Sequence, residues 1–243
     1  MSLFLVLAFL FFIGSVGGWI AELLFRRFFS NANPERKWIN PGLCTGPYLP
    51  LYGSGLCILF LLASLENKSF ITNPALNKAT LFLFMAIAMT AIEYVAGLFC
   101  LKITHVRLWD YRNEKWNVQG IICPKFSLIW AILGALYYFL IHNKVLHALY
   151  WLSQNLAFSF VIGFFFGVFL LDLIHATQFL VRLRKFAGEN DIILRYEALK
   201  VQLRQRHERN KEKYSFLLPF RSARPLNEYI KEMRDAYETR KRK

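Results

Sequence analysis

Long apolar segments separated by short polar ones run through the first three quarters of the chain. A helix needs about 20 apolar residues to cross the hydrocarbon core of a bilayer. Five segments approach or exceed that length, at residues 3–25, 49–65, 79–101, 123–141 and 156–181. The second is short and opens with Pro50, and the fourth is bounded by polar residues that begin at His142. The pattern predicts an all-α integral membrane protein with five transmembrane helices in residues 1–181.

The composition excludes most other classes of protein. Hydrophobic residues make up 56% of the 243 residues, aromatic residues 17% and charged residues only 19%. A soluble domain of this size has too much surface for so few polar residues, and a disordered chain would not carry so many apolar ones. We therefore expect the lipid bilayer to be the first partner of this protein.

Basic residues favour one orientation of the five predicted helices. With the N-terminus outside, the inner loops 26–48 and 102–122 carry most of the basic residues of the bundle, and the outer side holds only Lys68, Lys78 and Lys144. The positive-inside rule then predicts a cytoplasmic C-terminus. The tail after Val181 carries 18 basic and nine acidic residues without a nucleic-acid-binding motif. It favours the anionic inner leaflet, and we expect no nucleic-acid partner.

The tail, residues 182–243, shows apolar residues at helical spacing in two places. One predicted helix carries Ile192, Tyr196, Leu199 and Leu203, and a second follows Pro225 and carries Leu226, Tyr229, Ile230, Met233 and Tyr237. Both have basic polar faces. Such helices suit the membrane surface and the coiled coil of an oligomer equally well.

The two inner loops resemble each other. Each contains Trp, Asn, Gly, Cys and Pro in that order, from Trp38 to Pro47 in the first and from Trp116 to Pro124 in the second. Each follows a helix with one acidic residue and leads into another span. This similarity indicates a parallel two-span repeat of the kind found in transporters. Coincidence explains it equally well, because the shared residues are few and common near membrane surfaces.

Three carboxylates fall inside the predicted spans, at Glu22, Glu93 and Asp172. A carboxylate at such depth is costly, and small or polar residues share its helix face in each case. We therefore expect Glu22, Glu93, Asp172 and His175 to line a polar cavity that faces the cytoplasm. Two plainer interpretations stay open. Glu22 can pair with Arg26 one turn later, and His175 can simply hydrogen-bond Asp172.

The first inner loop is dense in glycine and proline between Asn40 and Gly53. Such a segment cannot form a regular helix before Pro50. Irregular backbone at membrane depth is tolerated only inside protein or beside a watery cavity. We expect the loop to dip toward the bundle and to present Asn40, Tyr48 and Tyr52 there. An ordinary interfacial turn is the alternative.

The second inner loop, residues 108–117, is polar and aromatic without hydrophobic periodicity. Its candidate contacts to a substrate or ion are Asp110, Tyr111, Asn117 and Gln119. Arg112 suits a phosphate or carboxylate group. A solvated loop anchored by its two tryptophans is again the alternative.

Four strings in the chain resemble a known bacterial family. They are GWIAELLFRRF from Gly18, NPGLCTGPYLPLYGSG from Asn40, IEYVAG from Ile92 and LWDYRNEKWNVQGIICPKFSLIW from Leu108. The family is labelled as ABC-transporter permeases of the CmpB-like, type IV kind, and the resemblance covers about residues 12–130. It implies a small permease-like protein of the bacterial inner membrane, and it supplies no catalytic residues.

The sequence adds three statements about partners and cofactors. There is no G-x-x-x-x-G-K-[ST] phosphate loop, so a permease of this kind needs a separate ATPase subunit. Five spans are few for a transporter, so we expect a homo-oligomer. The four cysteines and five histidines lack metal-ligand spacing, and we expect no metal and no cofactor.

The leading hypothesis is therefore an inner-membrane transport component without catalytic residues. Two alternatives remain. Glu93, Asp172 and His175 could perform acid–base chemistry on a lipid headgroup, which would make the protein an intramembrane enzyme. The basic tail could instead serve a membrane scaffold or regulatory protein.

Overall fold

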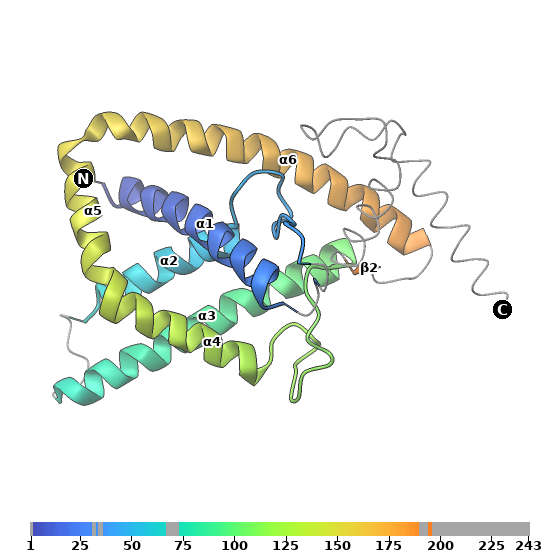
Figure 1. Ribbon diagram of the computed structural model, residues 1–243, viewed down its shortest axis with the longest axis horizontal. Helices are drawn as coiled ribbons and strands as arrows, with labels where there is room; N and C mark the ends of the chain where they lie inside the picture. The colour runs from blue at the N-terminus through green and yellow to red at the C-terminus, as the bar shows by residue number, and fades with distance from the viewer. Residues whose placement is uncertain (1, 31–32, 34–35, 67–72, 190–193, 196–243) are drawn as a thin grey trace.

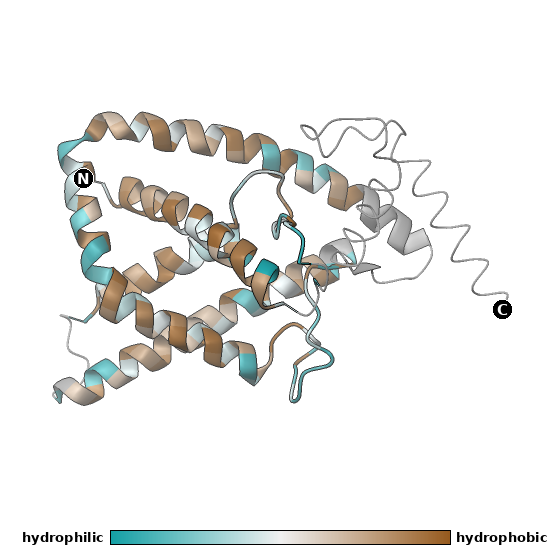
Figure 2. Cartoon of the chain, viewed as in Figure 1, coloured by the Kyte–Doolittle hydropathy of each residue, from teal (hydrophilic) through white to brown (hydrophobic). Residues whose placement is uncertain are grey.

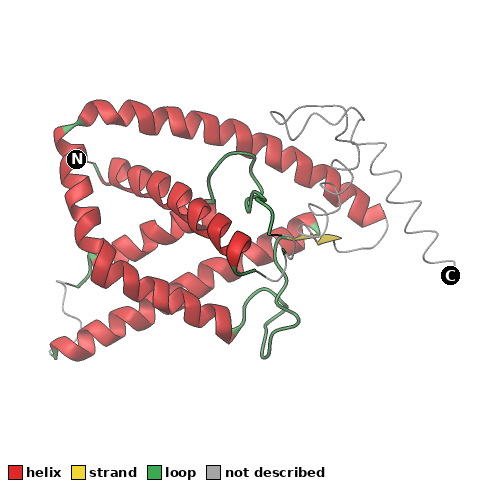
Figure 3. Ribbon diagram, viewed as in Figure 1, coloured by secondary structure: helices red, strands yellow, loops and turns green. Residues whose placement is uncertain are grey.

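The computed structural model describes residues 2–30, 33, 36–66, 73–189 and 194–195, and it is almost entirely helical (Figures 1 and 3). The long elements are α1 (Leu3–Phe28), α2 (Pro50–Ala63), α3 (Pro74–Thr104), α4 (Pro124–Leu136), α5 (His142–Gln154) and α6 (Ser159–Glu189). A π-helical turn, η1 (Tyr137–Ile141), joins α4 to α5, and a 3-10 turn, η2 (Leu156–Phe158), precedes α6. The chain is thus an all-α membrane protein.

Within the described residues, four helical stretches are long and apolar enough to cross a bilayer: Leu3–Phe28, Ala75–Lys102, Pro124–Gln154 and Leu156–Val181. The fifth apolar helix, α2, has only 14 residues. The helix begins at Pro50, whose missing N–H is tolerated in the first turn. It does not extend further back, because the chain before Pro50 is irregular, as the sequence predicts. The predicted second span is therefore a short helix behind a non-helical segment.

The fourth helix does not stop at residue 141 as the sequence analysis expected. The chain passes through the π turn and continues as α5 to Gln154. His142 is half-buried, and its Nδ1 lies 2.9 Å from the Tyr137 hydroxyl, so it is not a simple exit into water. The apolar side of α5 packs into the core through Val145, Leu149 and Leu152. The polar residues after Ile141 lie on the exposed side of an amphipathic helix.

The helices give the molecule two distinct ends (Figure 1). The N-terminus and α5 lie at one end, on the left of the view. The C-terminal end of α1 and the two long loops, residues 36–49 and 105–123, lie toward the other end. We call this second end the loop end.

The core lies where α1, α2, α3, α4 and α5 meet, around Leu10, Met85 and Leu152. Many large apolar side chains remain exposed on the outside of the helices, including Leu83, Phe139 and Leu171. Hydrophobic residues predominate along the long helices (Figure 2). An apolar exterior of this extent suits acyl chains and not water.

Small residues allow α1 and α2 to cross closely. A Cβ added at Gly18 would lie 2.2 Å from Cβ of Tyr52, and one added at Gly14 would lie 3.0 Å from Cα of Gly53. The glycines of α6 differ, since a Cβ at Gly163 or Gly167 would meet nothing within 4 Å. The glycine-lined face of α1 thus makes the expected close contact with another helix. At Gly163 and Gly167 of α6, no part of the described chain lies close enough for such a contact.

Two features lie at the margin of the described chain. The two-residue strands β1 (Val106–Arg107) and β2 (Leu194–Arg195) pair in parallel. The predicted tail helices at 192–203 and 226–237 fall almost wholly outside the described residues. The internal repeat and the tail organisation remain predictions.

Candidate functional site

The three acids that the sequence predicts within the spans lie on three different helices, and each receives a hydrogen bond from a different tyrosine. Glu22 on α1 is bonded by Tyr52, Glu93 on α3 by Tyr111 and Asp172 on α6 by Tyr48. Tyr48 comes from the loop at residues 36–49, Tyr52 from the start of α2 and Tyr111 from the loop at residues 105–123. All six of these residues are predicted from the sequence, whereas their pairing depends on how the helices pack.

Glu93 is buried, with 2% of its surface exposed. Its Oε1 accepts a hydrogen bond of 3.0 Å from the Tyr111 hydroxyl, and its Oε2 accepts one of 3.0 Å from Nε1 of Trp130. Both donors are neutral, and no basic side chain bonds to Glu93 within the described part of the chain. A buried carboxylate without a counter-charge is expensive to keep ionised, so this group is suited to binding a positive charge.

Glu22 is half-buried and has a counter-charge. Its Oε1 accepts a hydrogen bond of 2.8 Å from Nε of Arg26, one turn later on α1. Its Oε2 accepts one of 2.9 Å from the Tyr52 hydroxyl. The plainer interpretation of Glu22, an ion pair with Arg26, is thus present, and Tyr52 adds a contact between α1 and α2.

Glu22 and Glu93 belong to one cluster. The ring of Tyr52, which bonds Glu22, lies 5.3 Å from the ring of Trp130, which bonds Glu93. Burial, the Glu93 carboxylate and, more weakly, Glu22 all raise the pKa of Tyr111 far above its ordinary value, so its hydroxyl stays a donor at neutral pH. We call Glu22, Glu93, Tyr52, Tyr111 and Trp130 the acid cluster.

Asp172 has a separate set of partners. Its Oδ1 accepts from the backbone amide of Thr45 at 3.1 Å and from the Thr45 hydroxyl at 2.8 Å. Its Oδ2 accepts from the amide of Gly46 at 2.8 Å and from the Tyr48 hydroxyl at 2.5 Å. Burial and the neighbouring carboxylate raise the pKa of Tyr48 well above its ordinary value. Asp172 therefore binds α6 to the first inner loop.

Asn40 shapes that loop. Its Oδ1 accepts hydrogen bonds from Nε1 of Trp19 and from the amide of Gly42. Its Nδ2 donates to the carbonyl oxygens of Cys44 and Thr45. Asn40 thus holds the backbone of the turn that binds Asp172.

The remaining candidates of the second loop bond within the loop. Arg112 and Asp110 form an exposed ion pair of 2.9 Å. Asn117 donates to the carbonyl oxygens of Arg112 and Glu114 and accepts from the amide of Gly120. Gln119 is exposed, has a positive φ of 56°, and offers its carbonyl oxygen to Nη1 of Arg107. Of the five candidates in this loop, only Tyr111 reaches a buried acid.

His175 lies on the exposed side of α6, whereas Asp172 is buried. The structure shows no hydrogen bond between the two side chains. It also does not bring Asp172 into the acid cluster. The expected group of four residues is thus divided into the acid cluster, the Asp172 contact and an exposed histidine.

Trp130, Thr45 and Gly46 also bond to these acids and are not among the residues predicted from the sequence. Trp130 carries one signal that could have identified it, because a buried indole N–H usually finds an acceptor. The amides of Thr45 and Gly46 carry no such signal, since every residue but proline has one.

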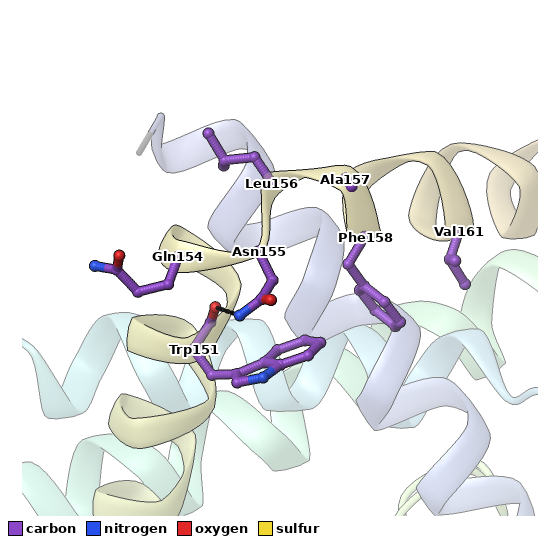
Figure 4. Close-up of a pocket in the computed structure, with 7 residues that line it drawn as sticks. All are labelled: Trp151, Gln154, Asn155, Leu156, Ala157, Phe158 and Val161. Carbon is purple, nitrogen blue, oxygen red and sulfur yellow. Dashed lines mark hydrogen bonds between the residues drawn. The ribbon is translucent and has the colours of Figure 1, made fainter.

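A surface hollow lies at the opposite end of the molecule, where α5 turns into α6 (Figure 4). The rings of Trp151 and Phe158 line it, and Nδ2 of Asn155 donates to the Trp151 carbonyl oxygen at 2.9 Å. It contains none of the predicted site residues. Within the described residues, no group of three or more His, Cys, Asp or Glu side chains is placed to hold a metal ion.

Comparison with known proteins identifies the class. The model of the family described as "Putative ABC-transporter type IV" matches residues 9–177, which is well over half of the chain. The chain therefore belongs to this family, and the resemblance of its inner-loop strings is confirmed. Family and apolar helices together indicate a multi-pass membrane component of a transport system. No curated protein matches the chain, and no solved structure does.

Proposed function

We propose that this chain is a permease-type transport subunit of the bacterial inner membrane and that the acid cluster is its carrier site. The observation that carries the proposal is Glu93, a buried carboxylate with two neutral donors and no basic partner in the described chain. Binding a proton or the cationic group of a solute removes the cost of its buried charge. Glu93 thus changes its charge during transport, and Glu22 stays paired with Arg26.

The proposal also assigns an orientation. The acid cluster receives Tyr111 from the second inner loop, which the positive-inside rule places in the cytoplasm. Met85 and Met89, with 1% and 3% of their surfaces exposed, belong to the tightly packed core beyond this site. The carrier site is therefore open to exchange from the cytoplasmic side and is closed from the outer side by this core.

Two partners belong to the proposal. A separate ATPase subunit supplies the energy, because the sequence has no phosphate-binding loop, and it docks on the cytoplasmic loops or tail. A second copy of the chain completes the translocation path, because the described part of one chain offers four long apolar helices and one short one, which are few for a transporter. Light scattering of the protein in nanodiscs should give a mass of at least two chains.

The intramembrane-enzyme alternative has less support. It required Glu93, Asp172 and His175 to act together, whereas Glu93 and Asp172 have separate sets of partners and His175 is exposed. The scaffold alternative depends on the tail, which lies almost wholly outside the described residues.

The charge of Glu93 can be tested without knowing the substrate. A hydrophobic carbodiimide reacts with protonated carboxyl groups in apolar surroundings, and mass spectrometry locates the adduct. We expect modification of Glu93 in membrane vesicles, faster at low pH, and none at Asp172. Tetraethylammonium should slow the reaction if a cationic solute also binds there.

Transport gives the second measurement. Liposomes containing the protein and its ATPase should lose flux when Glu93 is replaced by Gln, while insertion and mass stay unchanged. Full flux in E93Q, or no pH-dependent adduct at Glu93, would refute the carrier role.

A further inference from the structure

The turn formed by residues 44–48 surrounds one carboxylate with four donors, two on each oxygen. They are the amide and hydroxyl of Thr45, the amide of Gly46 and the hydroxyl of Tyr48, at 2.5–3.1 Å. The four donors come from three residues within the short segment 45–48. Asp172, in contrast, lies more than 120 positions away on α6 and contributes only the anion.

The turn is held in shape by contacts that do not involve Asp172. Asn40 binds the carbonyl oxygens of Cys44 and Thr45, and this helps to orient the amides that follow. Gly46 allows the Tyr48 ring to lie against the backbone, because a Cβ there would be 2.3 Å from the ring. Tyr48 is also packed against the rings of Phe165 and Phe169. The loop and its packing thus position the donors through contacts that do not depend on the bound carboxylate.

The chemistry of the donors selects the class of anion. All four are neutral dipoles, and no Arg or Lys side chain bonds to Asp172 in the described chain. Phosphate dianions are usually bound by Arg or Lys in addition to amides, whereas two pairs of neutral donors match the two oxygens of a monoanionic carboxylate. The site is therefore complementary to a small carboxylate.

We propose that residues 45–48 form a carboxylate-binding site and that Asp172 is its built-in occupant. A carboxylate from another molecule occupies the same four donors when Asp172 withdraws. Its binding exchanges the Asp172 hydrogen bonds between α6 and the first inner loop for bonds to the ligand. This site shares no residue with the acid cluster. An experiment can therefore refute the carboxylate-binding site without affecting the proposed role of Glu93, and the reverse also holds.

Removal of the built-in occupant tests the site. Full-length D172A is reconstituted in phosphatidylcholine nanodiscs, and its thermal unfolding is followed while sodium formate is added. We expect a saturable rise in the Tm of D172A that sodium chloride at the same ionic strength does not produce. Wild-type protein should respond far less, because its tethered Asp172 competes at high effective concentration.

A second variant identifies the donors. D172A/Y48F lacks the Tyr48 hydroxyl, and formate should bind it about tenfold more weakly than D172A, because a hydrogen bond to a charged group is lost. Phosphatidylserine nanodiscs distinguish the source of the carboxylate. Stabilisation of D172A by this lipid without formate assigns the natural ligand to a headgroup.

Cysteine labelling gives a measurement that does not depend on unfolding. Cys44 is the first residue of the turn and has 3% of its surface exposed. With Cys57, Cys100 and Cys123 replaced by Ala, D172A should react with N-ethylmaleimide at least about tenfold faster than the matched protein with Asp172, and formate should reverse this. D172N offers the same comparison if D172A does not insert, since its amide cannot serve all four donors. Any one of three results would overturn the proposal. Formate could leave the labelling rate of Cys44 unchanged, sodium chloride could raise the Tm of D172A as much as formate does, or D172A/Y48F could bind formate as tightly as D172A.

Discussion

Glu93 and Asp172 are both buried acids on long apolar helices, yet their surroundings differ in kind. Asp172 receives two hydrogen bonds on each oxygen, and two of the four come from the backbone of one turn. Glu93 receives one bond on each oxygen, from side chains on two different elements. A carboxylate with a full set of donors is stabilised as an anion and joins structural elements. One with fewer donors and no counter-charge is better suited to change its charge.

The largest expected effect in this comparison belongs to Asp172. Replacing it with Ala leaves four donors without their acceptor and removes the Asp172 hydrogen bonds between α6 and the loop, so we expect a loss of about 3–5 kcal/mol in the free energy of unfolding. Chemical denaturation in detergent measures this loss. If D172A lost less free energy of unfolding than E93Q, the proposed difference between the two acids would be contradicted.

A smaller effect is expected for Gly18, where α1 contacts α2. In G18A the added methyl would overlap Tyr52 and move its hydroxyl from Glu22, at a cost of about 1–3 kcal/mol. The adjacent Gly17 is the matched control, because a Cβ there meets nothing within 4 Å. G17A should be neutral or slightly stabilising, since Ala is the better helix former. Equal losses in both variants would mean that Tyr52 does not lie against α1.

E93Q should cost only about 1 kcal/mol of stability. The Gln side chain keeps one acceptor oxygen for Tyr111 or Trp130, and it removes the charge that is costly to bury. Thermal unfolding of E93Q beside D172N checks this. A small loss of stability in E93Q, together with lost flux, would distinguish Glu93 as a functional acid from Asp172 as a structural one.

The smallest effect is expected for Y52F. Glu22 loses the Tyr52 hydroxyl but keeps Arg26, so stability should fall by about 0.5–1.5 kcal/mol. Removing both partners, in Y52F/R26Q, should cost more than the sum of the single variants, because Glu22 is then left without either donor. A double-mutant cycle by chemical denaturation measures this coupling.

Much of the fold and part of the site follow from local pattern. The long apolar runs predicted the membrane class, and proline predicted that the chain before Pro50 is not helical. The cost of burying a charge marked Glu22, Glu93 and Asp172, and aromatic residues in irregular loops marked their tyrosine partners. The fourth helix continues past residue 141, where the sequence predicts the end of the span. His142 is a polar residue typical of a membrane exit, but it lies beside the rings of Phe60, Tyr137 and Tyr138 and stays partly buried.

The sequence by itself determined that this chain lies in a membrane, where its acids are and which kinds of side chain could satisfy them. Each of these conclusions depends on the free energy of placing one residue in one environment, which is a local property. Only the tertiary structure decided that Asp172 is held by backbone amides, that Glu22 and Glu93 share a cluster and that His175 faces outward. These facts depend on which helices meet and on how each is rotated, and distant parts of the chain determine that jointly.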